Sequence, residues 1–209
     1  GMSKAQDKKD VAAKICAAAQ KYKQNLVGRH FLYAFDGRFI EVAYQAKGFR
    51  HLTGVDTKLD AMSFYKKAVA GTLQASQIFF SAQHPYQLCT RKLKHLDEIV
   101  NLATSECFML ENITTETQSY QFGTTDLAFT LCMNRRPDAA GVYHTDKFSV
   151  ESLRDEDGFA RSEGAYTVTH ILSKPNDSLQ YTDIVYIDAQ ETLDTIPENA
   201  RALLAEKLC

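Results

Sequence analysis

The sequence has no run of apolar residues near the roughly 18 that a bilayer-spanning helix needs. Its N-terminus also lacks the apolar centre of a signal peptide, and Gly1 before Met2 is typical of an expression scar. We therefore expect no membrane association, and the cytoplasm is the default location.

Several motifs that hold nucleotides, metals or nucleophiles are also missing. The chain has no GxxxxGK(S/T) loop, no GxGxxG after a strand, no HExxH, no GxSxG and no paired CxxC. These absences exclude most ATPases, dehydrogenases, zinc hydrolases and serine hydrolases. His84, Cys89 and His95 are a loose potential ligand set, but Pro85 interrupts it and a fourth ligand is lacking. We expect no cofactor and no metal, so any chemistry falls to ordinary His, Lys, Arg, Tyr and Thr side chains.

Cysteines are few, odd in number and never paired closely in the sequence. An oxidised scaffold shows closer, paired spacings. We therefore expect reduced thiols that act mainly as small buried apolar residues, with the terminal one the most exposed. The five are Cys16, Cys89, Cys107, Cys132 and Cys209.

A net charge of −2 hides a strong asymmetry along the chain. Residues 1–100 carry 16 Lys and Arg against 8 Asp and Glu, whereas residues 101–209 carry 8 against 18. Such asymmetry can mark a face that binds a polyanion. Alternatively the halves neutralise each other in one fold, and the pI of about 6.3 favours this second interpretation.

The first part of the chain predicts helices and one hairpin. Apolar residues at helical spacing predict a helix over Asp10–Gln24. The aromatic and β-branched runs Phe31–Phe35 and Phe39–Tyr44 flank Asp36-Gly37, a strong hairpin signal. Further helices are expected between the cap Asp60 and Gly71, and from a cap at Thr90.

From Glu106 onward the pattern changes to short strand-like runs with turn-rich stretches between them. Pro197 at a first-turn position predicts a final helix. Helices and a hairpin followed by an antiparallel meander indicate an α+β fold. We expect one domain over residues 1–209 in which residues 1–105 and 106–209 share a core, with 190–209 as a C-terminal helical extension. The expected strands are Cys107–Ile113, Tyr120–Phe122, Leu127–Met133, Tyr166–Leu172 and Asp183–Ile187.

The segment Phe49–Gly54 (FRHLTG) concentrates polar side chains between apolar ones. Arg50 and His51 stand between Phe49 and Leu52, and Thr53 follows directly, so apolar neighbours could hold these polar side chains in place for a chemical role. A structural alternative is a histidine that satisfies buried backbone groups while Thr53 caps a turn, and the residues alone favour this alternative.

Together with two later segments, FRHLTG resembles the phage- and mobile-element-associated branch of a nuclease superfamily. That superfamily groups barnase, EndoU, the RNase colicins and RelE-type toxins, and the resemblance covers about residues 20–175. HLTG is the more specific element, whereas the two helical segments are common in amphipathic helices. The resemblance implies helices and a hairpin packed on a twisted antiparallel sheet. The later segments are Phe64–Leu73 and Arg91–Leu96.

The resemblance also implies metal-independent attack of a ribose 2′-hydroxyl on the adjacent phosphate. That reaction needs a base, an acid and cations, and histidine titrates near working pH. At matching positions His51 would be the acid or base, Thr53 its orienter or a phosphate donor, and Arg91 or Lys92 would neutralise phosphate charge. Arg50, Lys94 and His95 would assist substrate binding. These predictions extend to one positive face of Arg50, Lys66, Lys67, Arg91, Lys92 and Lys94.

A second candidate pair lies on the expected strand Tyr166–Leu172. His170 is a candidate catalytic residue and Lys174 a candidate substrate-binding residue. His170 shares its face with two aliphatic neighbours, which favours burial. The two residues stand about 13 Å apart on a strand that rises ~3.3 Å per residue, too far to serve one phosphate unless Lys174 reaches back.

Three functions are compatible with this sequence. The first is an RNase-like enzyme, toxin-like or from a phage. The second is the same fold without the chemistry, binding RNA, a protein or a small ligand. The third is a structural protein of a mobile element, whose acidic half 101–209 would bind a protein partner or inhibitor. The overall negative charge counts against the first, because RNA affinity depends on phosphate neutralisation.

Overall fold

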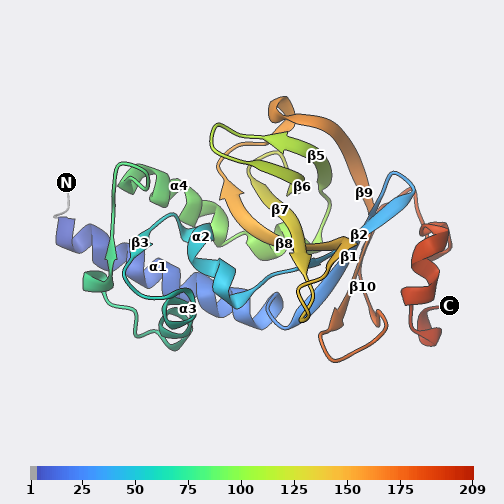
Figure 1. The fold of residues 1–209 in the computed structure, drawn as a ribbon, viewed down its shortest axis with the longest axis horizontal. Helices are drawn as coiled ribbons and strands as arrows, with labels where there is room; N and C mark the ends of the chain where they lie inside the picture. The colour runs from blue at the N-terminus through green and yellow to red at the C-terminus, as the bar shows by residue number, and fades with distance from the viewer. Residues whose placement is uncertain (1–3) are drawn as a thin grey trace. The chain divides into compact units, whose positions relative to one another are not determined.

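The computed structural model describes residues 4–209 (Figure 1). Gly1 and Met2, the expected scar and start, lie outside the described residues. Contacts divide the chain into two compact units, which do not coincide with its two halves. One holds the residues up to Val27 together with Gln45–Val100, and the other holds Gly28–Tyr44 together with Asn101–Cys209. We call them the helical unit and the sheet unit; the expectation of a single domain stays a prediction.

The helical unit contains most of the helices. A two-stranded sheet, β3 (Asp56–Thr57) with β4 (Ile78–Phe79), accompanies them. Two 3₁₀ turns, η1 (Ala46–Gly48) and η2 (Ala75–Gln77), complete it. The helices are α1 (Lys4–Asn25), α2 (Phe49–Thr53), α3 (Ala61–Ala70), α4 (Tyr86–Leu96) and the start of α5 (Ile99–Thr104), which runs into the sheet unit.

Aromatic rings form the core of the helical unit. Tyr22 of α1 lies with its ring centroid 5.2 Å from that of Phe49 and 6.5 Å from that of Tyr65. The Phe49 and Phe64 centroids are 6.3 Å apart. Phe49, the apolar start of FRHLTG, is therefore an anchor that holds α2 against α1 and α3.

Local signals located α3 correctly, whereas the start of α4 was wrong. Asp60 caps α3 by accepting a hydrogen bond from the Ser63 amide at 2.8 Å, and Gly71 ends it with φ of +74°. Helix α4 begins at Tyr86, four residues before the expected cap. Thr90 lies inside the helix, where its hydroxyl donates to the Gln87 carbonyl at 2.8 Å and so caps nothing.

The sheet unit is built on eight strands, and the pairings of seven of them close a ring, with β10 attached to β9 outside it. The order is β1-β2-β8-β7-β6-β5-β9-β10, and β9 also pairs with β1. The long strand β9 makes this possible, because Ser162–Thr167 pairs with β5 and Val168–Pro175 pairs with β1. The strands are β1 (Arg29–Phe35), β2 (Arg38–Ala43), β5 (Phe108–Thr114), β6 (Ser119–Thr125), β7 (Thr130–Pro137), β8 (Tyr143–Arg154), β9 (Ser162–Pro175) and β10 (Asp183–Ile187).

The expected hairpin is present, and its turn shows why. Asp36 and Gly37 have φ of +51° and +69°, as a two-residue hairpin turn requires. Strand β8 was missed, because its first half is polar and reads as a loop. The pairing of β2 with β8 is parallel, so the sheet is not a pure antiparallel meander.

The two faces of strands β1 and β2 meet different surroundings. On one face Phe35 packs against Phe122, and Phe122 against Phe148, with centroids 5.5 and 5.1 Å apart. On the opposite face Leu32 joins a cluster that includes the C-terminal segment. That cluster comprises Leu32, Ala34, Leu172, Tyr181, Ile196, Ala200 and Leu204.

The C-terminal segment is not the expected α-helix. It forms three 3₁₀ turns, η4 (Leu193–Thr195), η5 (Glu198–Leu203) and η6 (Glu206–Leu208), beside the sheet (Figure 1). Segments this short gain little from helix propagation. Their backbone instead bonds to Tyr181, whose amide donates to the Leu203 carbonyl at 2.7 Å. Tertiary contacts therefore replace helical ones.

All five cysteines are free, as expected. Cys89, Cys107 and Cys132 are buried, Cys16 is half-buried and Cys209 is exposed. Burial raises the pKa of Cys89 and of Cys107 to about 12, so both thiols stay protonated at neutral pH. These two act as small apolar core residues.

Candidate functional site

Strand register places four ionisable side chains on one face of the sheet unit. His30 of β1 lies opposite Lys174 of β9, and Glu41 of β2 lies opposite Lys147 of β8. Leu32 lies opposite Glu41, and since residues two apart on a strand share a face, it stands on the same side as His30. Four strands therefore contribute to one polar row.

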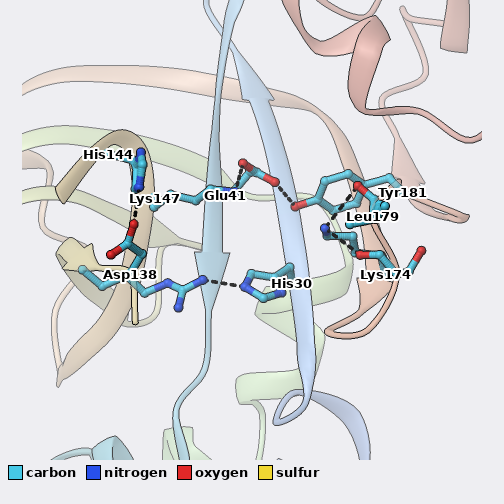
Figure 2. A network of polar contacts seen from close by, with 10 residues as sticks. His30, Glu41, Asp138, His144, Lys147, Lys174, Leu179 and Tyr181 are labelled. Atoms are coloured by element: carbon cyan, nitrogen blue, oxygen red, sulfur yellow. Dashed lines mark hydrogen bonds and ion pairs between the residues drawn. The ribbon is translucent and has the colours of Figure 1, made fainter. Parts of the chain in front are cut away.

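Hydrogen bonds and ion pairs tie members of this row to neighbouring side chains in several separate groups (Figure 2). Arg136 of β7 approaches His30, with 2.5 Å between Nη2 and Nε2. Lys147 donates to the buried carboxylate of Glu41, which also accepts from the Tyr181 hydroxyl at 2.8 Å. We call His30, Glu41, Arg136, His144, Lys147 and Lys174 the sheet-face site.

A cavity of about 340 Å³ opens at this site. Two of the side chains that line it contact each other, because His144 Nε2 lies 2.8 Å from an Asp138 carboxylate oxygen. The volume accommodates a phosphate group with part of its sugar. The lining residues are His30, Arg136, Pro137, Asp138, Ala139, His144 and Lys147.

Electrostatics keep the His30 ring neutral at physiological pH. Burial, followed by the charges of Arg136 and Lys174, lowers its pKa to about 4. A guanidinium can only donate, so Nε2 accepts and the ring proton resides on Nδ1. His30 is thus a base whose lone pair is covered by Arg136.

The same site holds more positive than negative charge. Arg136, Lys147 and Lys174 outnumber the carboxylates of Glu41 and Asp138, and burial lowers the pKa of both Arg136 and Lys174. Arg136 Nε and His30 Nδ1 are buried and find no hydrogen-bond partner among residues 4–209. Buried donors without partners cost stability, so an anionic ligand with oxygen acceptors would satisfy them.

The depressed pKa of His30 predicts a pH-dependent stability. Between about pH 6.5 and 4 the His30 ring is protonated in the unfolded chain but still neutral in the folded chain. Protons therefore favour the unfolded state, and the free energy of unfolding falls as the pH falls. Above pH 6.5 the ring is neutral in both states, so it adds nothing to the pH dependence of stability. The His30→Gln variant should therefore lose less stability than the wild type across this window. Urea unfolding at several pH values measures the difference, and parallel curves would contradict the assignment.

Tyr181 connects the site to the C-terminal segment. Its side chain is fully buried, and burial with the neighbouring Glu41 charge raises the pKa of its hydroxyl. Its backbone bonds on both sides, to the Leu203 carbonyl at 2.7 Å and from the Ala205 amide at 2.9 Å. The segment thereby fixes the hydroxyl that orients Glu41.

In the helical unit, the structure brings His51 together with Arg50 and Lys92. His51 is exposed on α2, with Nδ1 3.4 Å from Arg50 Nη2. Partial burial, then the charges of Arg50, Lys92 and His84, lower its pKa. His84 Nδ1 in turn lies 2.8 Å from a carboxylate oxygen of Asp56. Lys92, from the 91–95 segment, is thus near enough to act on His51 electrostatically, and a catalytic role for His51 stays a prediction.

Thr53 caps a turn, as the structural alternative to a catalytic role expected. It is fully buried, and its hydroxyl donates to the Arg50 carbonyl at 2.6 Å and accepts from the Val55 amide at 3.3 Å. Gly54 follows with φ of +78°, and an added Cβ there would lie 3.0 Å from Lys92 Cδ. Thr53 therefore closes α2 and leaves no hydroxyl proton for a phosphate.

The remaining sequence-predicted residues separate into exposed and buried ones. Arg91 and Lys94 of α4 are exposed. His95 is only 6% exposed, which counts against its expected role in substrate binding. It lies on the face of α4 that buries Leu93 and Leu96.

His170 is structural, as its aliphatic neighbours suggested. It is fully buried in the sheet unit, with Nε2 2.6 Å from the Thr192 carbonyl oxygen and Nδ1 2.8 Å from the Thr169 hydroxyl. Lys174, by contrast, joins the sheet-face site. Its Nζ donates to the Ser178 carbonyl at 2.9 Å and lies 5.3 Å from the Tyr181 ring.

Sequence reasoning missed His30, Glu41, Arg136, His144 and Lys147. His30 and Glu41 stand at polar positions of an otherwise apolar hairpin, and this local signal could have drawn attention to them. Arg136 lies in the stretch 134–141, which looked loop-like in the sequence but whose first residues belong to β7, and His144 and Lys147 lie where no strand was expected. Only the unexpected parallel pairing of β2 with β8 brings them to the hairpin.

The part of the chain that the structure describes holds no group of three or more His, Cys, Asp or Glu side chains arranged for a metal ion. Nor does any helix within residues 4–209 combine the length and the apolar character that crossing a bilayer requires.

Comparison with known proteins identifies the family. A model described as phage-Barnase-EndoU-ColicinE5/D-RelE like nuclease4 matches residues 14–190, most of the chain. No curated protein and no solved structure is significantly similar to it. The mixed fold, with helices and a large, mainly antiparallel sheet, is consistent with such a nuclease. The chain therefore belongs to the phage-Barnase-EndoU-ColicinE5/D-RelE like nuclease4 family.

Proposed function

We propose that this protein cleaves RNA by attack of a ribose 2′-hydroxyl on the adjacent phosphorus, at the sheet-face site. One observation carries the proposal: a neutral histidine, His30, lies 2.5 Å from Arg136 beside Lys147 at the mouth of a cavity. Membership of a nuclease family supports it. The site combines a base with cations, which is what this reaction needs when side chains supply the chemistry.

The arrangement suggests a role for each residue. A phosphate bound in the cavity would attract the Arg136 guanidinium and uncover the lone pair of His30 Nε2. That nitrogen takes the proton of the 2′-hydroxyl while the 2′ oxygen bonds to phosphorus. Arg136 and Lys147 stabilise the negative charge that builds on the phosphate oxygens. Glu41 accepts a hydrogen bond from Lys147 and so holds it in place.

The leaving group needs a proton of its own. His144, oriented by Asp138, would give one to the 5′ oxygen as its bond to phosphorus breaks. The products are a 2′,3′-cyclic phosphate and a free 5′-hydroxyl. Proton and bond counts balance, because His30 gains the proton that the hydroxyl loses and His144 supplies another.

An oligonucleotide cleavage assay tests the reaction. The expected result is a 2′,3′-cyclic phosphate product from an RNA strand, and no cleavage of the same strand with 2′-deoxyribose at every position. The deoxy strand keeps the phosphates, so it separates binding from chemistry. RNA bound without cleavage would favour the catalytically inactive binding module. Cleavage of the deoxy strand would refute attack by the 2′-hydroxyl.

The His51 cluster is the alternative location for the chemistry. It is supported by an exposed histidine beside Arg50 and Lys92. It is weakened because the Thr53 hydroxyl already donates its proton to the Arg50 carbonyl. The positive face that includes Arg91 and Lys94 stays a prediction, as does a protein partner or inhibitor on the acidic residues 101–209. Action on cellular RNA would place the protein in the cytoplasm, and the family description supports an origin in a phage or another mobile element.

A further inference from the structure

A buried carboxylate lies among the cations of the sheet-face site. Glu41 is only 3% exposed, and its two oxygens accept hydrogen bonds from two different side chains. Lys147 donates to Oε2, and the Tyr181 hydroxyl donates to Oε1 at 2.8 Å (Figure 2). Only one of the two donors is therefore a cation, and the other is neutral.

Arg136 is a second cation within reach of the Glu41 charge. It lines the His30 cavity, and its Nε is buried without a hydrogen-bond partner among residues 4–209. Burial lowers the pKa of Arg136, and the charge of Glu41 acts in the opposite direction. In the part of the chain that the structure describes, no hydrogen bond or ion pair joins these two side chains. Arg136 instead contacts His30.

The hydroxyl of Tyr181 explains why this pair does not form. A buried carboxylate oxygen needs a donor, and a hydroxyl provides one without adding charge. Burial raises the pKa of Tyr181, so its hydroxyl keeps its proton at neutral pH. With Oε1 satisfied in this way, Glu41 uses Lys147 alone among the cations, and Arg136 stays available to a ligand in the cavity.

The C-terminal segment keeps this hydroxyl in position. Tyr181 forms a parallel β-bridge with Leu204, and its ring is fully buried. Leu204 lies beyond residues 14–190, which the family model matches. The support for the hydroxyl therefore comes from a part of this chain outside the matched residues.

We propose that Tyr181 is a positioning residue, whose hydroxyl holds Glu41 on Lys147 and so reserves Arg136 for the phosphate of the substrate. This inference rests on the proposed function, because that phosphate belongs to the RNA. Without the hydroxyl, the Oε1 acceptor and the Arg136 Nε donor are both unsatisfied and of opposite charge. Glu41 would then pair with Arg136 and compete with the phosphate for it.

A double-mutant cycle tests the proposal by calorimetric titration with inorganic phosphate. The four proteins are the wild type, Tyr181→Phe, Glu41→Gln and the double variant. Tyr181→Phe is expected to weaken phosphate binding by about 5-fold or more. In the Glu41→Gln background the same change should alter the affinity by less than about 2-fold, because no charged carboxylate remains to compete. A hydroxyl with a merely structural role would have the same effect in both backgrounds.

Tyr186→Phe is the matched control. The Tyr186 hydroxyl also donates to a carboxylate, that of Asp188 at 3.2 Å, in the same unit but outside the sheet-face site. Its removal should leave phosphate binding as in the wild type. Thermal unfolding shows whether each variant folds. Should Glu41→Gln fail to fold, the comparison of the two tyrosine variants decides, since equal affinities would overturn the proposal.

The outcomes separate this inference from the proposed function. Wild-type affinity in Tyr181→Phe overturns the positioning role, whether or not RNA is cleaved. The expected pattern of affinities without any RNA cleavage by the wild type overturns the proposed catalysis and leaves the positioning of an anion site standing. A wild-type protein that binds no phosphate overturns both.

Discussion

Replacing His30 with alanine is expected to lower the rate of RNA cleavage by about 100-fold or more, the usual effect of losing a general base. The expectation follows from the unprotonated ring that His30 presents beside the cavity and from its contact with Arg136. Single-turnover cleavage of a labelled RNA measures it. Thermal unfolding followed by circular dichroism shows whether the variant still folds.

His51→Ala is the matched control for this prediction. His51 is exposed in the helical unit, so its removal should change neither folding nor the chemical step. The opposite pattern, with full activity in His30→Ala and a large loss in His51→Ala, would move the catalytic site to the FRHLTG segment. Losses of 100-fold in both variants would mean that both units contribute to catalysis.

Leu172→Ala is expected to lower the free energy of unfolding by about 2–5 kcal/mol, the range for truncating a buried leucine. Leu172 is fully buried in β9, between Leu32 of β1 and Ile184 of β10. It also belongs to the cluster that holds the C-terminal segment. Loss of this side chain leaves a cavity on the same face of the strands as His30 and Lys174.

Leu179→Ala makes the same chemical change at a position that is 91% exposed. Its free energy of unfolding should stay within about 0.5 kcal/mol of the wild type. Urea titration of both variants gives the comparison. A Leu172→Ala protein as stable as Leu179→Ala would show that the C-terminal cluster contributes little to the fold.

The closed ring of strand pairings explains how the sheet unit can hold a precise site. Every strand of the ring bonds on two sides, so the backbone beneath His30, Glu41 and Lys147 has little freedom to shift. The hydroxyl of Tyr181, fixed by the C-terminal segment, then orients Glu41. Catalytic groups are best held on such rigid elements.

Predictions from the sequence succeeded where the signal was local. The turn at Asp36-Gly37 and the caps of α3 depend on a few neighbouring residues, so the sequence located both correctly. The helix expected after Pro197 depended on local propensity as well, yet contacts with Tyr181 outweighed it. Strand β8 was missed because its polar first half is stabilised by pairing rather than by its own pattern.

Sequence alone determined the family, the α+β class, the hairpin and the burial of His170. Each of these depends on residues that are close together in the chain. Only the tertiary structure decided the sheet-face site. His30 and Arg136 are 106 positions apart, as are Glu41 and Lys147. Their meeting depends on the parallel pairing of β2 with β8, a long-range contact whose energy comes from the completed sheet and which no local signal encodes.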